Sequence, residues 1–442
     1  MKRASHERAN AEGRHFVKTL HRLLGCASLA LAMPVSAAGS GSAQHWISVW
    51  ATAQELLPPP VIAVPPPPPE ILAQLRAMPQ RLIPYPDTVE DATIRMVVQP
   101  TLAAATMRIQ LSNAAGKPPL TISSAHIALR ARGSAILPAT DRTITFGGKA
   151  IAYIPPGAMI VSDPVTLVAR PDQELAVSLY VKGRSPVTAH PIGLNSTYIA
   201  PGDQTGSAEL AKTQEVRSYF WLNGLEAATT PASGVVVAFG DSITDGFATT
   251  PGQHRSWPEI LAQRLRSRGG TPLSVLNMGI SGNRVLRDGA GASALARLDR
   301  DALSRPGVKW IVLLEGINDI NMSQMAALPA DQKATADDII AGLKAIVAKA
   351  HLNGIKVMGA TITATQGLWL YTADSEATRT AVNAWIRRSG TFDAVVDFDQ
   401  ATRDPAQPAR LRPDYDSGDH VHPNDAGTRA MAEAIDLAAF GR

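Results

Sequence analysis

The chain has 442 residues, enough for one large domain or two ordinary ones, and an apolar content of 45%, as in a soluble globular protein. Six of its 42 basic and two of its 38 acidic residues lie in the first 37 positions, so the remainder carries equal numbers of each. This balance argues against nucleic acid as a partner, because the excess of basic residues belongs to the first segment alone.

Residues 1–37 have the pattern of a secretory signal peptide. A basic start precedes the apolar run from Leu23 to Met33, and the small residues up to Ala37 suit cleavage by a signal peptidase. The alternative is a membrane anchor, but about eleven apolar residues are too few to cross a ~30 Å hydrocarbon core. We therefore expect a secreted or periplasmic protein with no integral membrane segment once the signal is removed.

The single cysteine, Cys26, lies within this predicted signal. A lipoprotein cleavage site at Cys26 is a second alternative, but Lys18 and Arg22 stand where such a site needs an apolar run. Removal of the signal leaves a chain with neither disulfides nor thiol catalysis, which suits an oxidising compartment.

Short stretches of alternating polarity, broken by Gly, Pro, Asn and Asp, fill residues 45–228. No long helical period interrupts them, so this half is predicted to be an all-β module, a sandwich or a jelly-roll-like fold. The clearest predicted strands are 93–98, 107–111, 144–146, 151–154 and 175–181.

A proline-rich segment, residues 58–69, contains eight prolines in twelve positions. Proline cannot donate to a strand ladder or sit inside a helix, so the segment is predicted to be a polyproline-type surface loop. We interpret it as a rigid loop or the edge of a lid; the alternative is a proline motif that binds a partner.

From residue 233 to residue 442 the pattern changes to strand, loop and helix in turn. Continuous apolar strands that alternate with amphipathic helices predict a parallel sheet covered on both faces, hence an α/β domain. Ligands of such sheets bind beyond the carboxyl ends of the strands. The predicted strands are 235–239, 273–276, 310–314, 355–360 and 392–397, and the predicted helices are 255–268, 335–352, 375–388 and 423–439.

The first of these strands runs directly into Gly240-Asp241-Ser242. A serine on a strand-to-helix turn faces the open edge of the sheet, and its backbone N–H begins a helix, so it suits a nucleophile with a donor beside it. The alternative is a helix cap, since Ser and Asp are both favoured there. The flanking carboxylates Asp241 and Asp245 are interpreted as turn caps and helix-terminal charges rather than as catalytic groups.

Three further segments are predicted to reach the same edge. Gly282 and Asn318 follow the second and third predicted strands, and Asp419 and His422 precede the last predicted helix. Asp319, next to Asn318, is expected to orient its loop.

Taken together and in this order, Gly240-Asp241-Ser242, Gly282, Asn318 and the Asp419-x-x-His422 pair resemble the four blocks of the SGNH, or GDSL-type, hydrolase superfamily. The resemblance covers roughly residues 233 to 440. It implies a flavodoxin-like α/β/α fold and no cofactor.

The resemblance also implies a role for each matching residue. Ser242 would attack an ester carbonyl, with His422 as its base and Asp419 as the partner of His422. The oxyanion hole would comprise the Gly282 N–H, the Asn318 side-chain amide and the Ser242 N–H.

The first half resembles a secreted bacterial subgroup that carries a β-module ahead of the hydrolase domain. This subgroup is similar to arylesterases and acylhydrolases associated with xylanase clusters. The matching segments are 46–53, 108–113, 162–165 and 197–198.

Elementary chemistry supports the same assignment. A serine hydroxyl needs an adjacent base, for which histidine has a suitable pKa, and a carboxylate on the other ring nitrogen leaves one nitrogen free for the serine proton. His420 competes for the role of base, but it lies one residue from Asp419 and lacks the three-residue step of the family. A metal site made of Asp419, His420 and His422 is a further alternative; no ligand-type spacing supports it, and we expect no metal.

Aromatic and charged residues near the predicted edge are candidates for contacts with substrate. Trp369 and Tyr371 follow the strand at 355–360, and Arg255 and Trp257 begin a helix; core or lid packing is an equal alternative. His190, in the β-module, is expected to be an ordinary polar loop residue.

These observations predict a secreted serine esterase that acts on a small-molecule or glycan ester, with short acyl or acetyl groups favoured. The alternatives are a xylan-type polysaccharide deacetylase or acyltransferase, or a lipase for longer chains. A glycan-binding envelope protein is the non-enzymatic alternative, but it would be expected to carry a damaged catalytic set, whereas every block is present.

Overall fold

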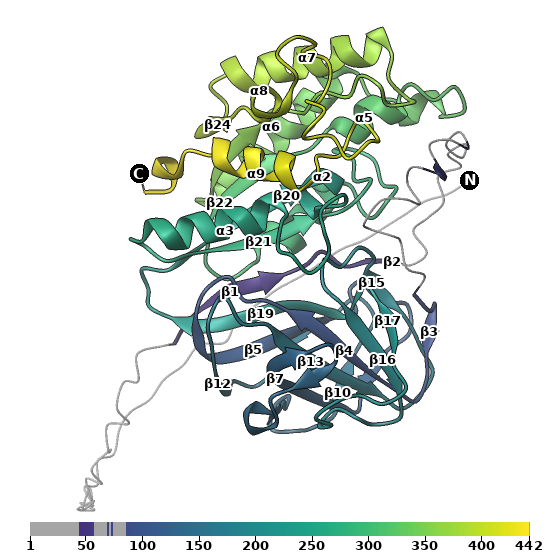
Figure 1. Cartoon of the computed structure of the whole chain (residues 1–442), viewed down its shortest axis with the longest axis vertical. Coiled ribbons are helices and arrows are strands. Elements are labelled where there is room, and N and C mark those ends of the chain that lie inside the picture. Colours follow the sequence, from purple (N-terminus) through teal and green to yellow (C-terminus); the bar gives the residue numbers. More distant parts are fainter. Residues whose placement is uncertain (1–43, 57–68, 70–71, 74–84, 442) are drawn as a thin grey trace, which may run out of the picture. The chain divides into compact units, whose positions relative to one another are not determined.

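Figure 1 shows a computed structural model of the chain, in which residues 44–56, 69, 72–73 and 85–441 are described. The predicted signal peptide, and all of the proline-rich segment except residue 69, lie outside the described residues. Residues 44–442 form one compact unit. Within the described part of the chain, no helix is long and apolar enough to span a membrane.

Antiparallel sheets make up the first half of this unit, as predicted. One has the strand order β17-β16-β4-β13-β7-β8, with β9 also paired to β7, and the other has the order β1-β19-β5-β11, with β12 also paired to β5. The first comprises β17 (Gln214–Val216), β16 (Thr197–Pro201), β4 (Ala92–Val98), β13 (Leu175–Val181), β7 (Ser124–Arg132), β8 (Ala135–Ile136) and β9 (Arg142–Thr143). The second comprises β1 (His45–Ala51), β19 (Leu222–Thr229), β5 (Ala104–Ser112), β11 (Met159–Val161) and β12 (Val165–Ala169).

Three small sheets complete this half. They are β10 (Ala152–Ile154) with β6 (Leu120–Ile122), β14 (Ser185–Pro186) with β3 (Thr88–Val89), and β18 (Tyr219–Phe220) with β15 (Thr188–His190) and β2 (Glu55–Leu56). A single-turn 3₁₀ helix covers Pro138–Thr140.

One predicted strand, 144–146, is wrong. The regular pairing with β7 ends at Thr143, and Phe146 forms only an isolated bridge with Lys149. The reason is the intervening Gly147-Gly148 pair, whose φ angles of +60° and +76° turn the chain back at once.

The second half is built on a parallel sheet with the order β21-β20-β22-β23-β24. Numbered within this half, the order is 2-1-3-4-5, that of the flavodoxin-like fold, so the predicted fold class is confirmed. The strands are β20 (Gly234–Gly240), β21 (Leu273–Gly279), β22 (Val308–Leu314), β23 (Lys356–Ala360) and β24 (Ala394–Val396). The order reverses at β20, and the crevice at such a point is where ligands bind.

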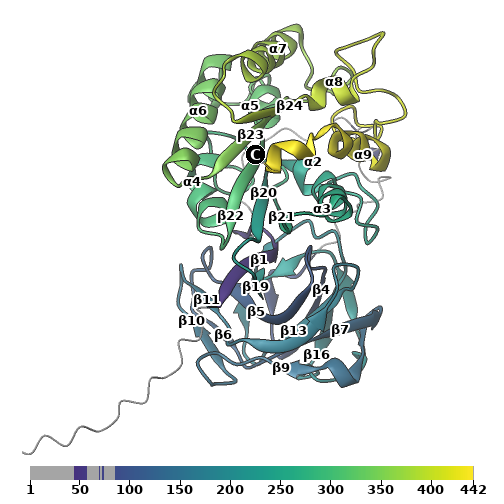
Figure 2. The ribbon, with the colours of Figure 1, turned by 90° about the vertical axis from the view of Figure 1, so that its left-hand side faces the viewer.

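Helices cover both faces of this sheet, with α3 and α9 on one and α6 on the other (Figure 2). Capping boxes begin the three longest helices: Ser256 with Glu259, Thr335 with Asp338, and Thr372 with Ser375. The helices are α2 (Ser242–Asp245), α3 (Trp257–Arg268), α4 (Ala294–Leu298), α5 (Ile317–Met322), α6 (Ala336–Leu352), α7 (Ala373–Arg388), α8 (Phe398–Thr402) and α9 (Asp425–Ala434), with a π-helical turn at Asp299–Leu303 and 3₁₀ turns at Ala330–Gln332 and Leu437–Gly441.

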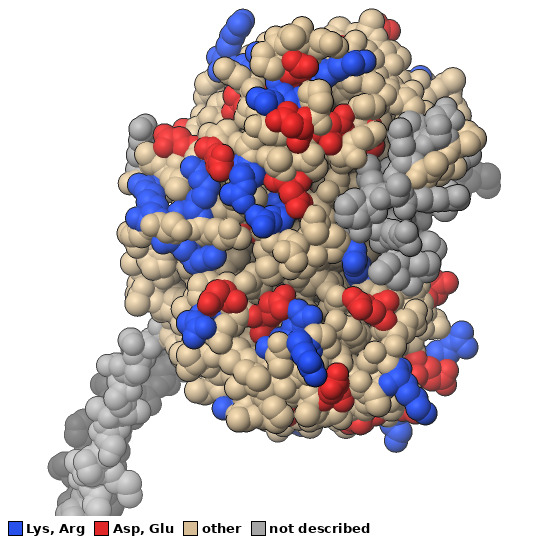
Figure 3. Space-filling view, in the orientation of Figure 1, with Lys and Arg blue, Asp and Glu red and all other residues tan. Residues whose placement is uncertain are grey.

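Helix α9 ends at Ala434, earlier than predicted. Arg264 of α3 donates to the carbonyl oxygens of Ala432 and Ile435, and Arg268 donates to that of Leu437. These contacts satisfy carbonyl groups at the end of α9. Figure 3 shows a group of basic side chains over α3 and α9.

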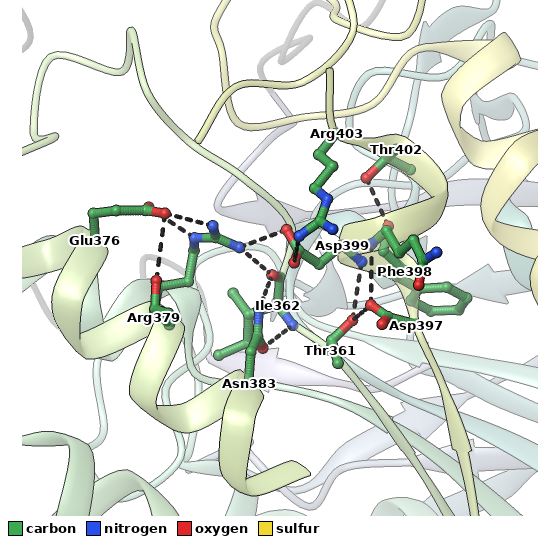
Figure 4. Close-up of polar contacts among 12 residues, drawn as sticks. Thr361, Ile362, Glu376, Arg379, Asn383, Asp397, Phe398, Asp399, Thr402 and Arg403 are labelled. Atoms are coloured by element: carbon green, nitrogen blue, oxygen red, sulfur yellow. Dashed lines mark hydrogen bonds and ion pairs between the residues drawn. The ribbon is translucent and has the colours of Figure 1, made fainter. Parts of the chain in front are cut away.

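A polar cluster joins α7 and α8 to the segment that follows β23 (Figure 4). Arg379 of α7 donates to the carbonyl oxygen of Ile362, at 2.9 Å, and to the carboxylate of Asp399, at 2.7 Å. Asn383, one turn later, also donates to the Ile362 carbonyl, at 2.7 Å. These bonds fix the backbone at the carboxyl end of β23.

The two halves share one hydrophobic core and several polar contacts. Strand β1 packs against β21, and the hydroxyl groups of Thr101 and Ser274 lie 2.7 Å apart. Arg305 donates to the side chain of Gln110 at 2.7 Å. The β-module therefore packs directly against the parallel-sheet half, and the two share one core.

Candidate active site

Ser242 lies where β20 ends and a one-turn helix, α2, begins. The Oδ1 atom of Asp241 accepts a 2.9 Å hydrogen bond from the Ile243 N–H, so Asp241 is the expected cap of α2. A Cβ atom on Gly240 would lie 2.5 Å from the Leu314 carbonyl oxygen, so glycine is required for the turn to lie this close to β22. Ser242 is thereby held at the carboxyl edge of the sheet.

A continuous chain of hydrogen bonds joins Ser242, His422 and Asp419. The Nε2 atom of His422 lies 2.7 Å from Ser242 Oγ, and its Nδ1 atom lies 2.5 Å from Asp419 Oδ2. Ser242 is only 7% exposed. With Nδ1 donating to the carboxylate, an unprotonated Nε2 is available to accept the serine proton.

The Asp419 carboxylate also shapes the turn that carries His422. Its Oδ1 atom accepts backbone N–H bonds from Val421, at 3.0 Å, and from His422, at 2.9 Å. Burial raises the pKa of Asp419, but the charge of His422 and these hydrogen bonds outweigh burial and lower the pKa to about 2. Asp419 is therefore ionised at neutral pH.

The contact with Asp419 also changes the pKa of His422. Burial lowers the pKa of His422, but the charge of Asp419 and its hydrogen bond have the larger combined effect and raise the pKa above 6.5. The ring of Phe247 packs at 4.6 Å from that of His422, a contact that the sequence did not single out.

His420 lies outside this chain of bonds. Its Nδ1 atom is 2.6 Å from Asp416 Oδ2, and its backbone is left-handed, with φ of +67°. The two histidines of the segment therefore have separate carboxylate partners, and the structure brings His422, not His420, to Ser242. No group of three or more His, Cys, Asp or Glu side chains that could hold a metal ion occurs among the described residues.

The two other predicted residues, Gly282 and Asn318, follow the neighbouring strands. Gly282 has φ of +83°, and a Cβ atom there would lie 2.8 Å from the Cβ of Ala290. Asn318, in the first turn of α5, donates to the Asn283 carbonyl oxygen at 2.9 Å. One amide hydrogen of Asn318 thus binds the residue after Gly282, and the second stays available for an oxyanion.

Beneath these turns lies Arg297 of α4, which the sequence analysis missed. It is fully buried and donates to the carbonyl oxygens of Gly240, at 2.9 Å, and Met278, at 2.8 Å, and to the side chain of Asn283, at 2.8 Å. Arg297 therefore joins the ends of β20 and β21 to the segment beside Gly282. On sequence alone it resembles any helical arginine.

Arg297 lies among buried carboxylates, with Glu315 at 3.3 Å and Asp301 at 3.5 Å. Burial raises the pKa of Asp241 to about 7, although the hydrogen bond from Ile243 and the charge of His422 lower it. Burial likewise raises the pKa of Asp319 to about 6. Asp319 accepts the backbone N–H of Val285 at 2.8 Å, so it also orients the segment after β21.

His190 corrects a prediction. It is not a polar loop residue but the last residue of β15, and it is 3% exposed. Its Nδ1 atom lies 2.9 Å from the Ala53 carbonyl oxygen, and its Nε2 atom lies 2.9 Å from Asp245 Oδ1. Asp245 in turn is no simple helix-terminal charge, because it bonds a residue of the β-module.

The candidates for substrate contact lie in three different places. Trp257 is 0% exposed and packs 5.5 Å from the ring of Phe398, so it belongs to the core. Trp369 and Tyr371 are half-buried in the segment between β23 and α7. Arg255 is half-buried beside α9, where it lines a shallow cavity, and no described bond links it to Ser242.

Comparison with known proteins gives a match for the parallel-sheet half. Residues 238–430 match the model of the GDSL-like Lipase/Acylhydrolase family. No curated protein matches the chain.

Among solved structures, similar chains include a GDSL-like lipase from Bacteroides thetaiotaomicron, with 21% identity over 47% of this chain and 88% of that one and a TM-score of 0.35. An acetylxylan esterase from Geobacillus stearothermophilus has 22% identity over 48% and 95%, with a TM-score of 0.36. An α/β hydrolase enzyme from the metagenome of Lake Arreo, Spain, has 23% identity over 48% and 96%, with a TM-score of 0.37.

Proposed function

We propose that this chain, whose C-terminal half is a domain of the GDSL-like lipase/acylhydrolase (SGNH) family of carboxylic ester hydrolases, cleaves esters of short acyl groups through an acyl-enzyme on Ser242. The observation that carries the proposal is the chain of hydrogen bonds from Ser242 through His422 to Asp419. The base, His422, already lies within hydrogen-bond distance of both the nucleophile and the orienting carboxylate, as nucleophilic acyl transfer requires.

In the first half-reaction, Ser242 Oγ bonds to the ester carbonyl carbon while its proton passes to His422 Nε2. The carbonyl oxygen becomes an oxyanion, which the Ser242 and Gly282 N–H groups and the Asn318 amide would stabilise. Asp419 keeps its negative charge and stabilises the imidazolium. The intermediate collapses when the bond to the alcohol oxygen breaks and His422 returns the proton to that oxygen.

In the second half-reaction, water replaces the alcohol. His422 takes one proton from water as its oxygen bonds to the acyl carbon, and the same oxyanion forms again. Collapse breaks the bond to Ser242 Oγ, which recovers a proton from His422, and the carboxylic acid leaves. An alcohol acceptor in place of water would give acyl transfer by the same steps.

The restriction to short acyl groups is supported by the surroundings of the nucleophile. Ser242 is 7% exposed, and the ring of Phe247 packs on that of His422 at 4.6 Å. A small acyl group such as acetyl needs little additional room beside the serine. Acetylated glycans fit the same restriction, because their acyl group is small and the glycan is the alcohol part of the ester.

We also propose that the protein is exported, to the periplasm or the medium. The support is the signal-like pattern of residues 1–37 and the absence of cysteine from the sequence beyond it. Amino-terminal sequencing of the protein recovered outside the cytoplasm should give a start close to residue 38.

The test of the proposed activity is an ester panel. p-Nitrophenyl acetate, butyrate, octanoate and palmitate, together with acetylated xylan, would be assayed with the wild type, Ser242→Ala and the exposed-serine control Ser267→Ala. We expect turnover to fall with acyl length, to disappear in Ser242→Ala and to persist in Ser267→Ala. Retained hydrolysis in Ser242→Ala would overturn the proposal, and a preference for palmitate would overturn its acyl-length part.

A further inference from the structure

A buried contact between the β-module and the helix of the nucleophile lies outside the triad. His190, on β15, and Asp245, at the end of α2, are 55 residues apart in sequence, and their side chains are 3% and 4% exposed. The ring of Tyr219 on the adjacent strand β18 stacks on His190 at 6.3 Å. The contact therefore lies in the interior, where an ionic hydrogen bond is little screened.

The two acceptors of His190 determine its protonation. A backbone carbonyl oxygen only accepts, so Nδ1, facing Ala53, carries a hydrogen. The Nε2 atom lies 2.9 Å from Asp245 Oδ1. Burial lowers the pKa of His190, but the charge and hydrogen bond of Asp245 outweigh burial and raise it to about 9. The geometry thus corresponds to an imidazolium bonded to a carboxylate.

Asp245 also accepts hydrogen bonds from residues at and just beyond the end of the neighbouring strand β21. Its second oxygen, Oδ2, accepts a 2.7 Å hydrogen bond from Ser281 Oγ, and its backbone oxygen accepts one of 3.2 Å from Asn277. A Cβ atom on Gly279 would lie 2.3 Å from the Asp245 nitrogen, so α2 and the end of β21 are in closest contact there. Ser281 directly precedes Gly282.

The same small sheet touches this segment a second time. Strand β2 pairs with β15, and Glu55 on β2 reaches Gly291, where a Cβ atom would lie 3.2 Å from Glu55 Oε2. Glu55 is 4% exposed, and burial raises its pKa to about 7, although the charge of His190 lowers it. The sheet β18-β15-β2 therefore supports residues 281–291 both through Asp245 and at Gly291.

We propose that His190 is a positioning residue for the hydrolytic site: its imidazolium holds Asp245, and through Ser281 it keeps the Gly282 N–H and Ser242 aimed at the same oxyanion. This inference rests on the proposed function. Oxyanion donors must be held within about 0.5 Å of their productive place, so the loss of a supporting bond reduces the rate of the chemical step rather than substrate affinity. The β-module would then contribute to catalysis without touching substrate.

Two substitutions separate the bond to Asp245 from the bond to Ala53. His190→Gln places its amide near the position of Nε2 and retains a donor toward Asp245, whereas His190→Asn places its amide near Nδ1 and retains only the donor toward Ala53. The matched control is His126→Gln. His126 also lies in the β-module, and its Nδ1 atom lies 2.9 Å from a carboxylate oxygen of Asp141, so a glutamine amide near Nε2 removes that bond.

The measurement is kcat per active site, with sites counted by fluorophosphonate titration so that unfolded protein does not contribute. We expect His190→Asn to lower kcat at least tenfold with KM within twofold, His190→Gln to recover most of the loss, and His126→Gln to match the wild type. A kcat per site within twofold of the wild type in His190→Asn would overturn the proposal. If that variant does not fold, Ser281→Ala removes the last bond of the chain and must show the same loss.

A second readout does not depend on turnover. In the Ser242→Ala background, backbone hydrogen exchange of residues 278–284 should be faster with His190→Asn and intermediate with His190→Gln, while residues 309–314 of β22 stay unchanged. Unchanged exchange at residues 278–284 would overturn the positioning role. If the wild type itself shows no turnover that depends on Ser242, the proposed function fails instead, and the exchange result separates the two failures.

Discussion

The Nε2 atom of His422 lies 2.7 Å from the Oγ atom of Ser242, although 180 positions separate the two residues in sequence. Ser242 is placed by the end of β20, and His422 by a turn in which the Asp419 carboxylate accepts the backbone N–H groups of Val421 and His422. Two independent local structures therefore meet at one edge of the parallel sheet.

Replacement of His422 should remove most of the activity, whereas replacement of His420 should not. His422→Gln removes the base that bonds Ser242, so kcat for p-nitrophenyl acetate should fall on the order of 10⁴-fold or more. His420→Gln removes only the partner of Asp416 and should retain activity within a few-fold. Steady-state kinetics of both variants measures these effects. A severe loss in His420→Gln with a mild loss in His422→Gln would show that His420, not His422, is the base.

The pH dependence of ester hydrolysis should follow His422. The base acts when neutral, and Asp419 raises the pKa of His422, so kcat/KM should rise with pH and reach half its plateau above pH 6.5. In Asp419→Asn the stabilising negative charge is gone, the pKa of His422 falls, and the acid limb should move to lower pH.

Asp416→Asn is the control for that profile. The Asp416 carboxylate acts on His422 only through space and is a smaller cause of its raised pKa, so the limb should move less than in Asp419→Asn. Equal positions of the limb in Asp419→Asn and the wild type would refute the assignment of His422 as the titrating base.

Removal of the Asn318 amide should reduce the rate without weakening binding. One lost oxyanion donor costs on the order of 10²–10³ in kcat, and KM should change little because the interaction forms mainly in the transition state. Asn321→Ala, three residues later in α5, controls for disturbance of the helix. A change confined to KM would instead make Asn318 a ground-state binding residue.

Periodicity predicted most of the fold, because each apolar strand and amphipathic helix has its own local pattern. The parallel strands at 235–239 and 310–314 lie within β20 and β22. The strand at 144–146 failed because two glycines reverse the chain, and α9 ends early because its terminal carbonyl groups are satisfied by arginines of α3. A periodic pattern of apolar residues contains neither the backbone conformation of the two glycines nor the contacts of the arginines.

The residues of the candidate site could be predicted from the sequence where they follow strand ends in a fixed order, as Ser242 and Asn318 do. His190 and Arg297 were not, for a physical reason. Each is buried, and the groups that satisfy its N–H donors come from distant strands and helices: Asp245 for His190, and the Gly240 and Met278 carbonyl groups for Arg297. A lone histidine or arginine in sequence gives no sign of such compensation.

The His190–Asp245 contact should make stability depend on alkaline pH. The pKa of His190 in the folded protein, about 9, exceeds the ordinary value of 6.5. The stabilisation by this contact is therefore fully present below pH 6.5 and is lost as pH rises through about 9. The pH-dependent part of the difference in unfolding free energy between the wild type and His190→Asn should be on the order of 3 kcal/mol.

Urea unfolding at a series of pH values measures this difference. The control is Thr188→Val on the same strand, which removes a buried hydroxyl with no described partner and adds no titrating group. Its deficit should be the same at pH 6 and pH 9.5. A deficit of His190→Asn that is equally flat would show that His190 is not charged in the folded protein.

The most direct measurement on Ser242 is the site at which a fluorophosphonate becomes attached, located by peptide mass spectrometry. Attack by Ser242 Oγ on phosphorus displaces fluoride and leaves a stable adduct on that oxygen, and its formation needs the base and the oxyanion donors that ester cleavage needs. We expect one adduct, on Ser242, formed in step with the loss of hydrolysis and absent from Ser242→Ala. Complete loss of hydrolysis with the adduct on another residue, or full labelling of Ser242 with hydrolysis intact, would contradict Ser242 as the nucleophile.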